Sequence, residues 1–378
     1  MSIRVGMIGY QFMGRAHSIA YRNIPFYFKN TTRPVLQTLC GRNSQNVSRA
    51  ASEMGWSSSE TEWEKMIQRE DIDLIDIVSP NHTHAEIAIA AAEAGKHVIC
   101  EKPLATTLED AKRMLEAVEK AGVMHMVCHN YRFAPAIQLA KKMIEEGQLG
   151  KIYHIRAVYL QDWLIDPSAP VTWRLQKERT GSGALGDIGS HIIDLARFLV
   201  SEISEVSGLL ETFIKERPSA AENTDEKELV TVDDASIFTT KFENGALGVF
   251  EASRFATGNR NGNRIEINGE KGSIRWDLEN MNHLHVYLEN DSAELQGFRT
   301  INCTGEVYPY GENYWPPGHI LGYEHTFINL IKTMMDSIKN KTLEVPNFKD
   351  GYLNQLVIHA VEESHRLKKW VKLSDYIN

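Results

Sequence analysis

Short apolar segments alternate with helix-like segments over the first 130 residues. Continuous apolar runs of this length are typical of strands that are buried on both faces of a parallel sheet. They predict strands over 3–8, 35–40, 74–78, 97–100 and 124–128. Helices are predicted over 15–21, 83–94 and 106–121, the last with a capping box from Thr106 to Glu109. This alternation predicts a doubly wound parallel sheet with right-handed crossovers.

The pattern changes after residue 130. A helix is predicted over 135–146, a long alternating strand over 152–163 and another helix over 188–200. Strands dominate from 206 to about 304, where Asn244-Gly245 and the segment Gly269–Gly272 predict tight connections between antiparallel neighbours. Helices over 323–339 and 350–369 follow. The polar segment 215–228 is expected to be a solvated loop, with a lid near a pocket as the alternative.

These elements predict two domains. Residues 1–130 would form the α/β domain, and residues 131–378 an α+β domain built on a large open sheet that is mainly antiparallel. Because helices are expected on one face of that sheet, its other face would be free. A free sheet face is often used for self-association, so we expect a homodimer or homotetramer that forms through it.

Composition narrows the class of protein. The chain has 378 residues and a net charge of -9, with 42% hydrophobic and 24% charged residues, which suits two domains that each have a core. An acidic chain is not expected to bind nucleic acid, and no apolar run approaches the roughly 20 residues of a membrane span. The first residues have no secretory layout. We expect a cytoplasmic protein whose cysteines are reduced thiols, namely Cys40, Cys100, Cys128 and Cys303.

Gly9 and Gly14 enclose a turn between the first strand and the first helix. A glycine-rich turn in this context puts a pyrophosphate against helix N–H groups and the positive end of the helix dipole, as in Rossmann domains. Gln11 replaces the second glycine of GxGxxG, so its side chain would restrict the approach of the phosphates or contact the ligand itself. We expect dinucleotide contacts from Gly9, Gln11, Phe12, Met13 and Gly14. A turn that only packs the helix on the strand is the alternative.

The end of the second strand bears on the choice of cofactor. NAD-selective sites place Asp or Glu there to bind the ribose 2′-hydroxyl, but this chain has Gly41 at that position. Arg42 and Ser44 could donate hydrogen bonds to a 2′-phosphate. The sequence therefore favours NADP slightly over NAD. Stacking of Arg42 on adenine, or its exposure to solvent, is the alternative.

Another loop, Ser79-Pro80-Asn81-His82-Thr83-His84, follows the strand over 74–78 and opens a helix. A loop at the carboxyl end of a parallel strand is expected to line a ligand. His82 and His84 suggest a metal superficially, but no cysteine or carboxylate cluster completes a site. No metal is expected.

Glu101-Lys102-Pro103 follows the strand over 97–100, and with it the chain resembles a known family. The resemblance is to the Gfo/Idh/MocA family of NAD(P)-dependent sugar and polyol oxidoreductases. It also rests on Ser79-Pro80-Asn81 with His84, on Asn130-Tyr131-Arg132 and on Gly186-Asp187-Ile188-Gly189-Ser190-His191, which stand in the family's order. Tyr159–Trp163, Trp173-Arg174 and Gly181–Gly186 look like the levoglucosan dehydrogenase branch of this family. Gln11 is the main departure.

The resemblance implies roles for individual residues. Lys102 is expected near nicotinamide and substrate, and Asp187 and His191 take the places of the family's catalytic carboxylate and histidine. Further cofactor contacts are expected from Ser79, Pro80, Asn81, His84, Glu101, Lys102 and Asn130. Substrate contacts are expected from Tyr131, Gln161, Trp163, Arg174, Asp187 and His191. For Trp163 and Trp173, ordinary core packing is the alternative.

The chemistry of the three catalytic candidates agrees with these roles. Asp187 and His191 are four residues apart at the start of one predicted helix, so both can project from one face. Oxidation of a secondary alcohol removes a hydroxyl proton while hydride leaves the carbon. An imidazole is a suitable proton acceptor, and the ammonium of Lys102 would stabilise the developing alkoxide. From the residues alone, a structural helix pair is the alternative for Asp187 and His191.

The sequence thus predicts an NAD(P)-dependent dehydrogenase that acts on a secondary hydroxyl of a sugar, anhydrosugar or cyclic polyol. Two alternatives stay open because a fold does not determine a function. One is a glycosidase that uses the cofactor for a transient oxidation. The other is a non-catalytic NAD(P)-binding regulator of the same fold.

Overall fold

The computed structural model describes residues 2–29, 31–221 and 225–377. Contacts divide the chain into two compact units, one of Met1–Phe133 with Leu321–Leu353 and the other of Ala134–Ile320 with Asn354–Asn378. The predicted domains, 1–130 and 131–378, did not place Leu321–Leu353 with the N-terminal residues. Residues 1 and 378, at the limits of the predicted domains, lie outside the described residues.

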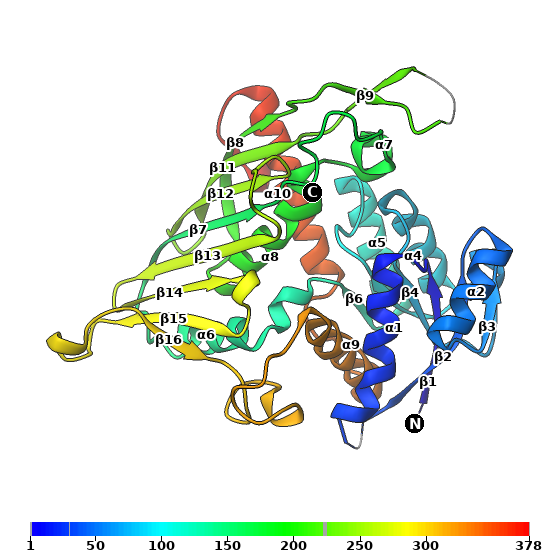
Figure 1. Cartoon of the computed structure of the whole chain (residues 1–378), viewed down its shortest axis with the longest axis horizontal. Helices are drawn as coiled ribbons and strands as arrows, with labels where there is room; N and C mark the ends of the chain where they lie inside the picture. Colours follow the sequence, from blue (N-terminus) through cyan, green and yellow to red (C-terminus); the bar gives the residue numbers. More distant parts are fainter. Residues whose placement is uncertain (1, 30, 222–224, 378) are drawn as a thin grey trace. The chain divides into compact units, whose positions relative to one another are not determined.

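The first unit contains a parallel sheet of six strands, as the alternating pattern predicted (Figure 1). Its strand order is β3-β2-β1-β4-β5-β6, which reverses direction at β1 and is therefore doubly wound. The strands are β1 (Ser2–Ile8), β2 (Arg33–Cys40), β3 (Ser58–Glu60), β4 (Leu74–Ile77), β5 (His97–Cys100) and β6 (His125–Val127). β3 was not predicted, because its three residues are polar and only partly buried.

Helices cover this sheet because their apolar faces pack on its strands. They are α1 (Phe12–Tyr27), α2 (Ser44–Met54), α3 (Trp63–Ile67), α4 (His84–Glu93) and α5 (Leu108–Ala121), with a 3-10 turn at Asn81–Thr83. One core cluster joins β4 and β5 to α4 and α5 through Ile75, Ile77, Val98, Ile87, Ala91, Met114 and Val118. The predicted capping box is displaced by one residue: Asp110 N donates to Thr107 Oγ1 at 3.1 Å, so Thr107 is the N-cap of α5.

Ring contacts with α1 explain why Leu321–Leu353 belongs to the first unit. In α9 (Tyr323–Asn340), the ring of Tyr323 stacks on Phe12 at 6.3 Å and that of Phe327 lies 5.3 Å from His17. Further along the chain, Val127 N donates to Pro346 O at 3.0 Å, which ties this segment to β6. Contacts between residues so far apart in the sequence cannot be predicted from the local pattern of hydrophobic residues.

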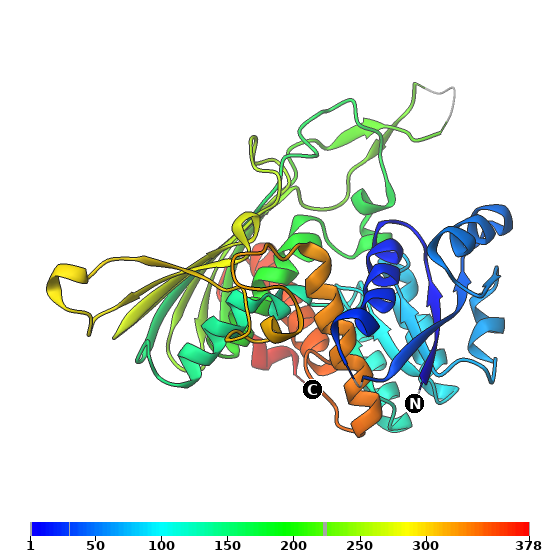
Figure 2. The ribbon, with the colours of Figure 1, turned by 60° about the horizontal axis from the view of Figure 1, so that its bottom comes forward.

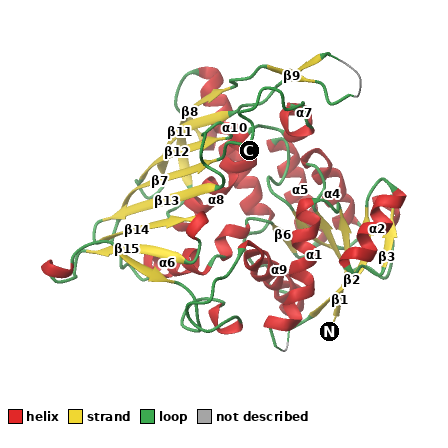
Figure 3. Ribbon diagram, viewed as in Figure 1, coloured by secondary structure: helices red, strands yellow, loops and turns green. Residues whose placement is uncertain are grey.

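The second unit is built on a mixed sheet of nine strands, in the order β16-β15-β14-β13-β7-β12-β11-β8-β17 (Figure 3). The β7–β12 pair is parallel and the other neighbours are antiparallel, which confirms the mainly antiparallel prediction. Both predicted tight connections are present, at β11–β12 and β13–β14. The strands are β7 (Ile152–Leu160), β8 (Ile203–Glu211), β11 (Ala235–Phe242), β12 (Leu247–Ser253), β13 (Gly262–Gly269), β14 (Gly272–Asp277), β15 (His283–Leu288), β16 (Arg299–Asn302) and β17 (Val371–Lys372).

Helices lie on one face of the nine-stranded sheet (Figure 2). They are α6 (Pro135–Glu145), α8 (Ser190–Leu199) and the part of α10 (Phe348–Leu367) from Asn354 onward, with the short α7 (Lys177–Thr180) nearby in the sequence. α10 packs on β8, where Gly208 N donates to Ser364 Oγ at 3.0 Å. On the other face, Leu209, Ile237, Leu247 and Val249 are each at least half exposed.

The remaining turns are short. One-turn 3-10 segments occur at Asn130–Phe133, Trp173–Leu175, Leu278–Asn280, Ala293–Leu295, Gly311–Asn313 and Leu373–Tyr376, and a π-helical turn at Leu185–Gly189. The loop prediction for 215–228 is wrong at its ends, because β9 (Glu216–Pro218) and β10 (Lys227–Leu229) pair as an antiparallel ribbon. Residues 222–224 of that segment lie outside the described residues.

Two further expectations concern the whole chain. The four cysteines are buried free thiols, which confirms that they form no disulfide. Among the described residues, the helices are all too short or too polar to span a bilayer.

Candidate functional site

The turn after β1 is shaped by two close backbone approaches. Gly9 has φ +109°, and a Cβ atom there would lie 2.7 Å from Val78 O. A Cβ atom on Gly14 would lie 2.8 Å from Gly9 O. Only glycine fits at both positions without a shift of the backbone, so the shape of the turn itself requires both glycines.

The start of α1 suits an anion. Gln11 is the N-cap residue, and its side chain makes no capping hydrogen bond. The first N–H groups of α1 therefore lack a side-chain acceptor, and Gln11 and Phe12 are exposed, with Met13 half-buried. N–H groups at the positive end of a helix dipole bind phosphate groups, so the residues present fit the pyrophosphate of a dinucleotide.

Gly14→Ala is expected to weaken cofactor binding about tenfold, since a Cβ atom 2.8 Å from Gly9 O must displace the turn. Fluorescence titration with NADH measures the dissociation constant. Gly297→Ala is the matched control, because a Cβ atom there meets nothing within 4 Å. Equal affinities of the two variants would show that the turn does not contact the cofactor.

The end of β2 carries no carboxylate at the predicted position. A Cβ atom on Gly41 would lie 2.2 Å from Cε1 of Tyr10, so the ring of Tyr10 occupies the space of a side chain. Arg42 and Ser44 are exposed, and the Asn43 side chain accepts a hydrogen bond from Asn46 N at 2.9 Å to cap α2. These residues are therefore accessible to a ligand.

A pocket lies beside the glycine turn, between α1 and α2. It is lined by Tyr10, Gln11, Arg15, Asn46, Arg49, Ala50, Glu53 and Met54. The sequence analysis missed its two guanidinium groups, because an arginine on an exposed helical face gives no distinctive signal. Arg42 and Ser44, which it selected, do not line this pocket.

The loop after β4 is tied to the loop after β5 by His84. Its Nε2 atom lies 2.9 Å from Ser79 O, and Nδ1 lies 3.1 Å from Pro103 O. Burial lowers the pKa of His84 below its ordinary value, against the hydrogen bonds to these backbone oxygens, which raise it. His84 is fully buried, which assigns it to positioning these loops, whereas Ser79 and Pro80 are half-buried and Asn81 is nearly buried.

Glu101 and Lys102 stand at the carboxyl end of β5, before the cis bond to Pro103. Glu101 Oε1 lies 3.0 Å from His17 Nε2, and Lys102 N donates to Glu101 Oε2 at 3.1 Å. Burial alone would raise the pKa of Glu101, but the hydrogen bond and charge of His17, together with the charge of Lys102, lower it. Glu101 is therefore ionised at neutral pH, while the Lys102 side chain is half-buried.

Asn130 and Tyr131 contact α9. Asn130 Nδ2 donates to Thr326 Oγ1 at 2.8 Å, and the Tyr131 ring lies 6.3 Å from that of Tyr323. Both residues are buried. They are thus fixed within the first unit by a helix that the sequence analysis assigned to the other domain.

In the second unit, Asp187 lies in the π-helical turn and His191 in the first turn of α8. π-helical turns are rare and occur frequently at functional sites. His191 is nearly buried, with its ring 5.8 Å from that of Tyr159, and Asp187 is half-buried with Oδ2 3.8 Å from an Arg254 nitrogen. The predicted pair is therefore placed on adjoining turns of one continuous helical segment.

Gln161 and Trp163 form a polar chain just beyond β7, which ends at Leu160 and not at Trp163 as predicted. Trp163 Nε1 donates to Gln161 Oε1 at 2.9 Å, and Gln161 Nε2 donates to Asn261 Oδ1 at 2.9 Å. Tyr159 donates to the same Asn261 oxygen at 2.8 Å. The contacts of Tyr159 thus connect Gln161 and Trp163 to His191.

Trp163 and Arg174, both expected to contact the substrate, lie in different surroundings. Trp163 is 45% exposed, which excludes the core-packing alternative within this structure. Arg174 is exposed and lies over the Trp173 ring at 4.4 Å. Among the described residues, no hydrogen bond or ring contact joins Arg174 to Gln161 or Trp163.

Asp233 and Arg254 support the turn that carries Asp187, and both were missed. Asp233 accepts hydrogen bonds from Gly183 N at 2.7 Å and Leu185 N at 2.8 Å. Arg254 is fully buried, donates to Asp233 O at 3.0 Å and lies 5.5 Å from the Trp163 ring centroid. These contacts join residues that are at least 21 positions apart in the sequence, so no local pattern predicts them.

Comparisons with known proteins give the class of protein. Residues 3–129 match the model of an oxidoreductase family with an NAD-binding Rossmann fold, and residues 137–275 match the GFO/IDH/MocA C-terminal domain. The chain is therefore a dehydrogenase with an NAD-binding domain, as the glycine turn and the parallel sheet indicate.

The relatives extend over almost the whole chain. Levoglucosan dehydrogenase of Pseudarthrobacter phenanthrenivorans is 44% identical over 98% of this chain and 98% of that protein. Myo-inositol 2-dehydrogenase of Thermotoga maritima is 27% identical over 99% of this chain and 100% of that protein. A solved structure of levoglucosan dehydrogenase in complex with NADH and levoglucosan has TM-score 0.96 and 45% identity, covering 99% of this chain and 100% of that one. The chain belongs to the Gfo/Idh/MocA family of oxidoreductases.

Proposed function

We propose that this dehydrogenase oxidises a secondary hydroxyl of a sugar, anhydrosugar or cyclic polyol and reduces NAD(P). The observation that carries the proposal is the group around His191. A half-buried carboxylate, an imidazole, an amide and a half-exposed indole are linked by contacts in one unit. Hydrogen-bonding groups beside an aromatic face suit a polyhydroxylated ring. The similarity to levoglucosan dehydrogenase supports the same substrate class.

Each of the catalytic residues has a separate task in this proposal. His191 accepts the hydroxyl proton at a ring nitrogen, and Asp187 keeps the imidazole and substrate in orientation. The ammonium of Lys102 stabilises the negative charge that develops on the same oxygen. When bound, the nicotinamide supplies the acceptor for hydride.

Substrate recognition is assigned to Tyr131, Gln161, Trp163 and Arg174. Gln161 offers an amide whose two ends already contact Trp163 and Asn261, so its orientation is fixed before substrate binds. The exposed indole of Trp163 offers a face for a sugar ring. Arg174 keeps its proposed role on the resemblance alone.

For the cofactor, we propose that NADP is accepted and slightly favoured over NAD. Support comes from Gly41 in place of a carboxylate, from the exposed Arg42, and from Arg15 and Arg49, which line the pocket together with Glu53. The levoglucosan dehydrogenase structure named above contains NADH, which favours NAD as the alternative cofactor.

Arg49→Ala is expected to raise KM for NADP about tenfold and leave KM for NAD within about threefold, because one charge-assisted contact to a 2′-phosphate is lost. Initial rates with each cofactor measure the effect. Arg42→Ala tests in the same way whether Arg42 donates to the 2′-phosphate. A parallel change with both cofactors, or none, would contradict the assignment of this pocket to the 2′-phosphate.

We further propose a cytoplasmic homodimer or homotetramer that associates through the open face of the nine-stranded sheet. The exposed Leu209, Ile237, Leu247 and Val249 support this surface. A comparison of the molar mass in solution of the wild type with that of Leu247→Glu tests association through this face.

A spectrophotometric screen tests the function itself. Levoglucosan, monosaccharides and inositols are supplied with NAD and with NADP, and absorbance of the reduced nicotinamide is followed. Accumulation of reduced cofactor in proportion to the oxidised sugar is the expected result. Cleavage of a glycoside without net reduction would identify the glycosidase alternative, and cofactor binding without turnover over the whole panel would identify the regulator.

A further inference from the structure

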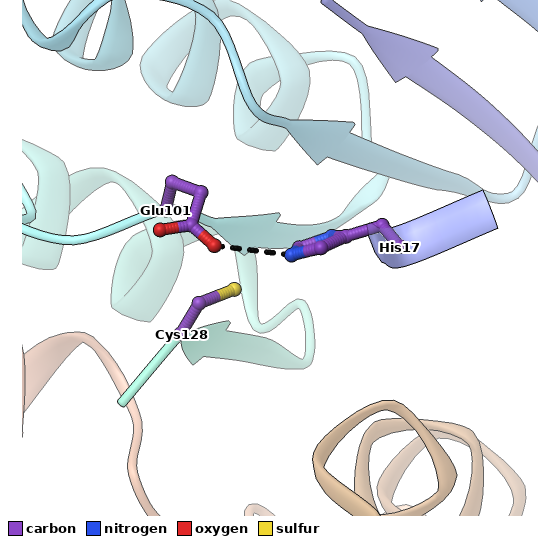
Figure 4. Close-up of side chains that lie close together, drawn as sticks. All are labelled: His17, Glu101 and Cys128. Carbon is purple, nitrogen blue, oxygen red and sulfur yellow. Dashed lines mark hydrogen bonds and ion pairs between the residues drawn. The ribbon is translucent and has the colours of Figure 1, made fainter. Parts of the chain in front are cut away.

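A cluster of buried ionisable side chains lies beneath the loop that carries Lys102. Ligand atoms of His17, Glu101 and Cys128 all lie within 4.8 Å of one another (Figure 4). On its other side, His17 Nδ1 lies 2.9 Å from Asp76 Oδ2. His17 and Asp76 are fully buried, and Glu101 is 5% exposed. The sequence analysis assigned no role to His17, Asp76 or Cys128.

The arrangement fixes the protonation of His17. Both ring nitrogens face carboxylate oxygens, which only accept hydrogen bonds when ionised, so both nitrogens carry hydrogen. Burial alone would lower the pKa of His17, but the charge and hydrogen bond of Asp76, together with the contact of His17 with Cys128, raise it well above its ordinary value. The ring is thus an imidazolium that bridges two carboxylates.

The other polar groups beside this cluster carry no charge at neutral pH. Burial raises the pKa of the Cys128 thiol, of the Tyr21 hydroxyl and of the Tyr323 hydroxyl, so all three are neutral. On a third side, the Phe327 ring lies 5.3 Å from the imidazole. The two carboxylates are therefore the charged partners of His17.

The same observations argue against a metal ion in this cluster. A metal requires a neutral imidazole nitrogen and a thiolate. Here both imidazole nitrogens already lie within hydrogen-bond distance of carboxylate oxygens, at 2.9 and 3.0 Å, so neither offers a free lone pair to an ion. Glu101 Oε1 contacts His17, and Glu101 Oε2 accepts a hydrogen bond from Lys102 N at 3.1 Å.

We propose that His17 is a positioning residue for Lys102: bound between Asp76 and Glu101, it fixes the carboxylate that orients the Lys102 backbone. The inference rests on the proposed function, in which the Lys102 ammonium stabilises the alkoxide. A change at His17 should therefore reduce the rate of the chemical step more than the binding of cofactor or substrate.

Two amide variants separate the two contacts of His17. The amide nitrogen of asparagine takes the place of Nδ1, and that of glutamine takes the place of Nε2. His17→Asn keeps the donor to Asp76 and loses the donor to Glu101, so kcat should fall about 10–100-fold with KM for sugar and cofactor within about threefold. His17→Gln should restore kcat to within about fivefold of the wild type. Cys128→Ala, which leaves the contacts of His17 with Asp76 and Glu101 in place, is the control expected to stay within about threefold.

The charge of His17 is measured without turnover. In protein labelled with ¹⁵N-histidine, the His17 ring should show two protonated nitrogens at pH 7.5, with the resonance assigned by its loss in His17→Asn. A neutral ring, one bound zinc per purified chain, or equal kcat values for wild type, His17→Asn and His17→Gln would overturn the proposal. Equal losses in both amide variants together with weaker NADH binding would show a purely structural role. If the wild type oxidises no sugar, the proposed function is wrong. A neutral His17 ring would separately show that His17 does not bridge two carboxylates as an imidazolium.

Discussion

Replacing His191 with alanine is expected to lower kcat by about 10²–10⁴, which corresponds to about 3–5 kcal/mol of transition-state stabilisation. The side chain lies in the first turn of α8, nearly buried against Tyr159, so it is fixed before substrate binds. Without the imidazole, the hydroxyl proton must pass to water while hydride leaves. Initial rates of cofactor reduction with the best substrate of the screen measure the loss.

A matched histidine variant separates this effect from a general loss of structure. His285→Ala changes a half-exposed histidine of β15 whose ring contacts Thr300. It is expected to retain the wild-type rate. Affinity for NADH should be unchanged in both variants, because the expected cofactor contacts do not include His191 or His285. Wild-type kcat in His191→Ala would remove the proposed proton acceptor from the mechanism.

Replacing Lys102 with alanine is expected to lower kcat by about 10²–10³, because the developing alkoxide loses an adjacent positive charge. The backbone of Lys102 is fixed by Glu101, and the charge of Lys102 in turn favours ionised Glu101. The KM for sugar should rise less than kcat falls, since the charge on the oxygen exists in the transition state and not in the bound alcohol.

Lys120→Ala is the control for the loss of one positive charge. Lys120 is an exposed residue in the last turn of α5, and its removal should leave kcat unchanged. If Lys102→Ala changes only KM for the cofactor, Lys102 binds the dinucleotide and does not act on the alkoxide. The proposal would then need another source of positive charge at the oxygen.

The larger part of the fold could be predicted from the sequence because it depends on local patterns. Apolar runs identified β1, β2, β4, β5 and β6, and the Asn244-Gly245 pair identified the β11–β12 hairpin. The errors occur where local patterns are weak or the chain packs at long range. β3, β9 and β10 are three-residue polar strands, and α9 packs on α1 although about 300 residues separate them.

The candidate site shows the same division. The glycine turn, Glu101-Lys102 and Asp187 with His191 were selected from motifs, and the backbone geometry of Gly9 and Gly14 agrees with the predicted turn. The supporting residues His17, Asp233 and Arg254 were missed. Each acts through a contact with a residue far along the chain, and a buried histidine or arginine gives no sign in the sequence of its partner.

The central claim is that one ammonium and one imidazole act on the same hydroxyl in the same step. A double-mutant cycle on kcat/KM tests it, with Lys102→Ala, His191→Ala and the variant that carries both changes. Because groups that act together give non-additive losses, the double variant should be only slightly slower than the slower single variant. A double variant whose loss equals the product of the two single losses would show that the residues act independently, which would contradict the mechanism.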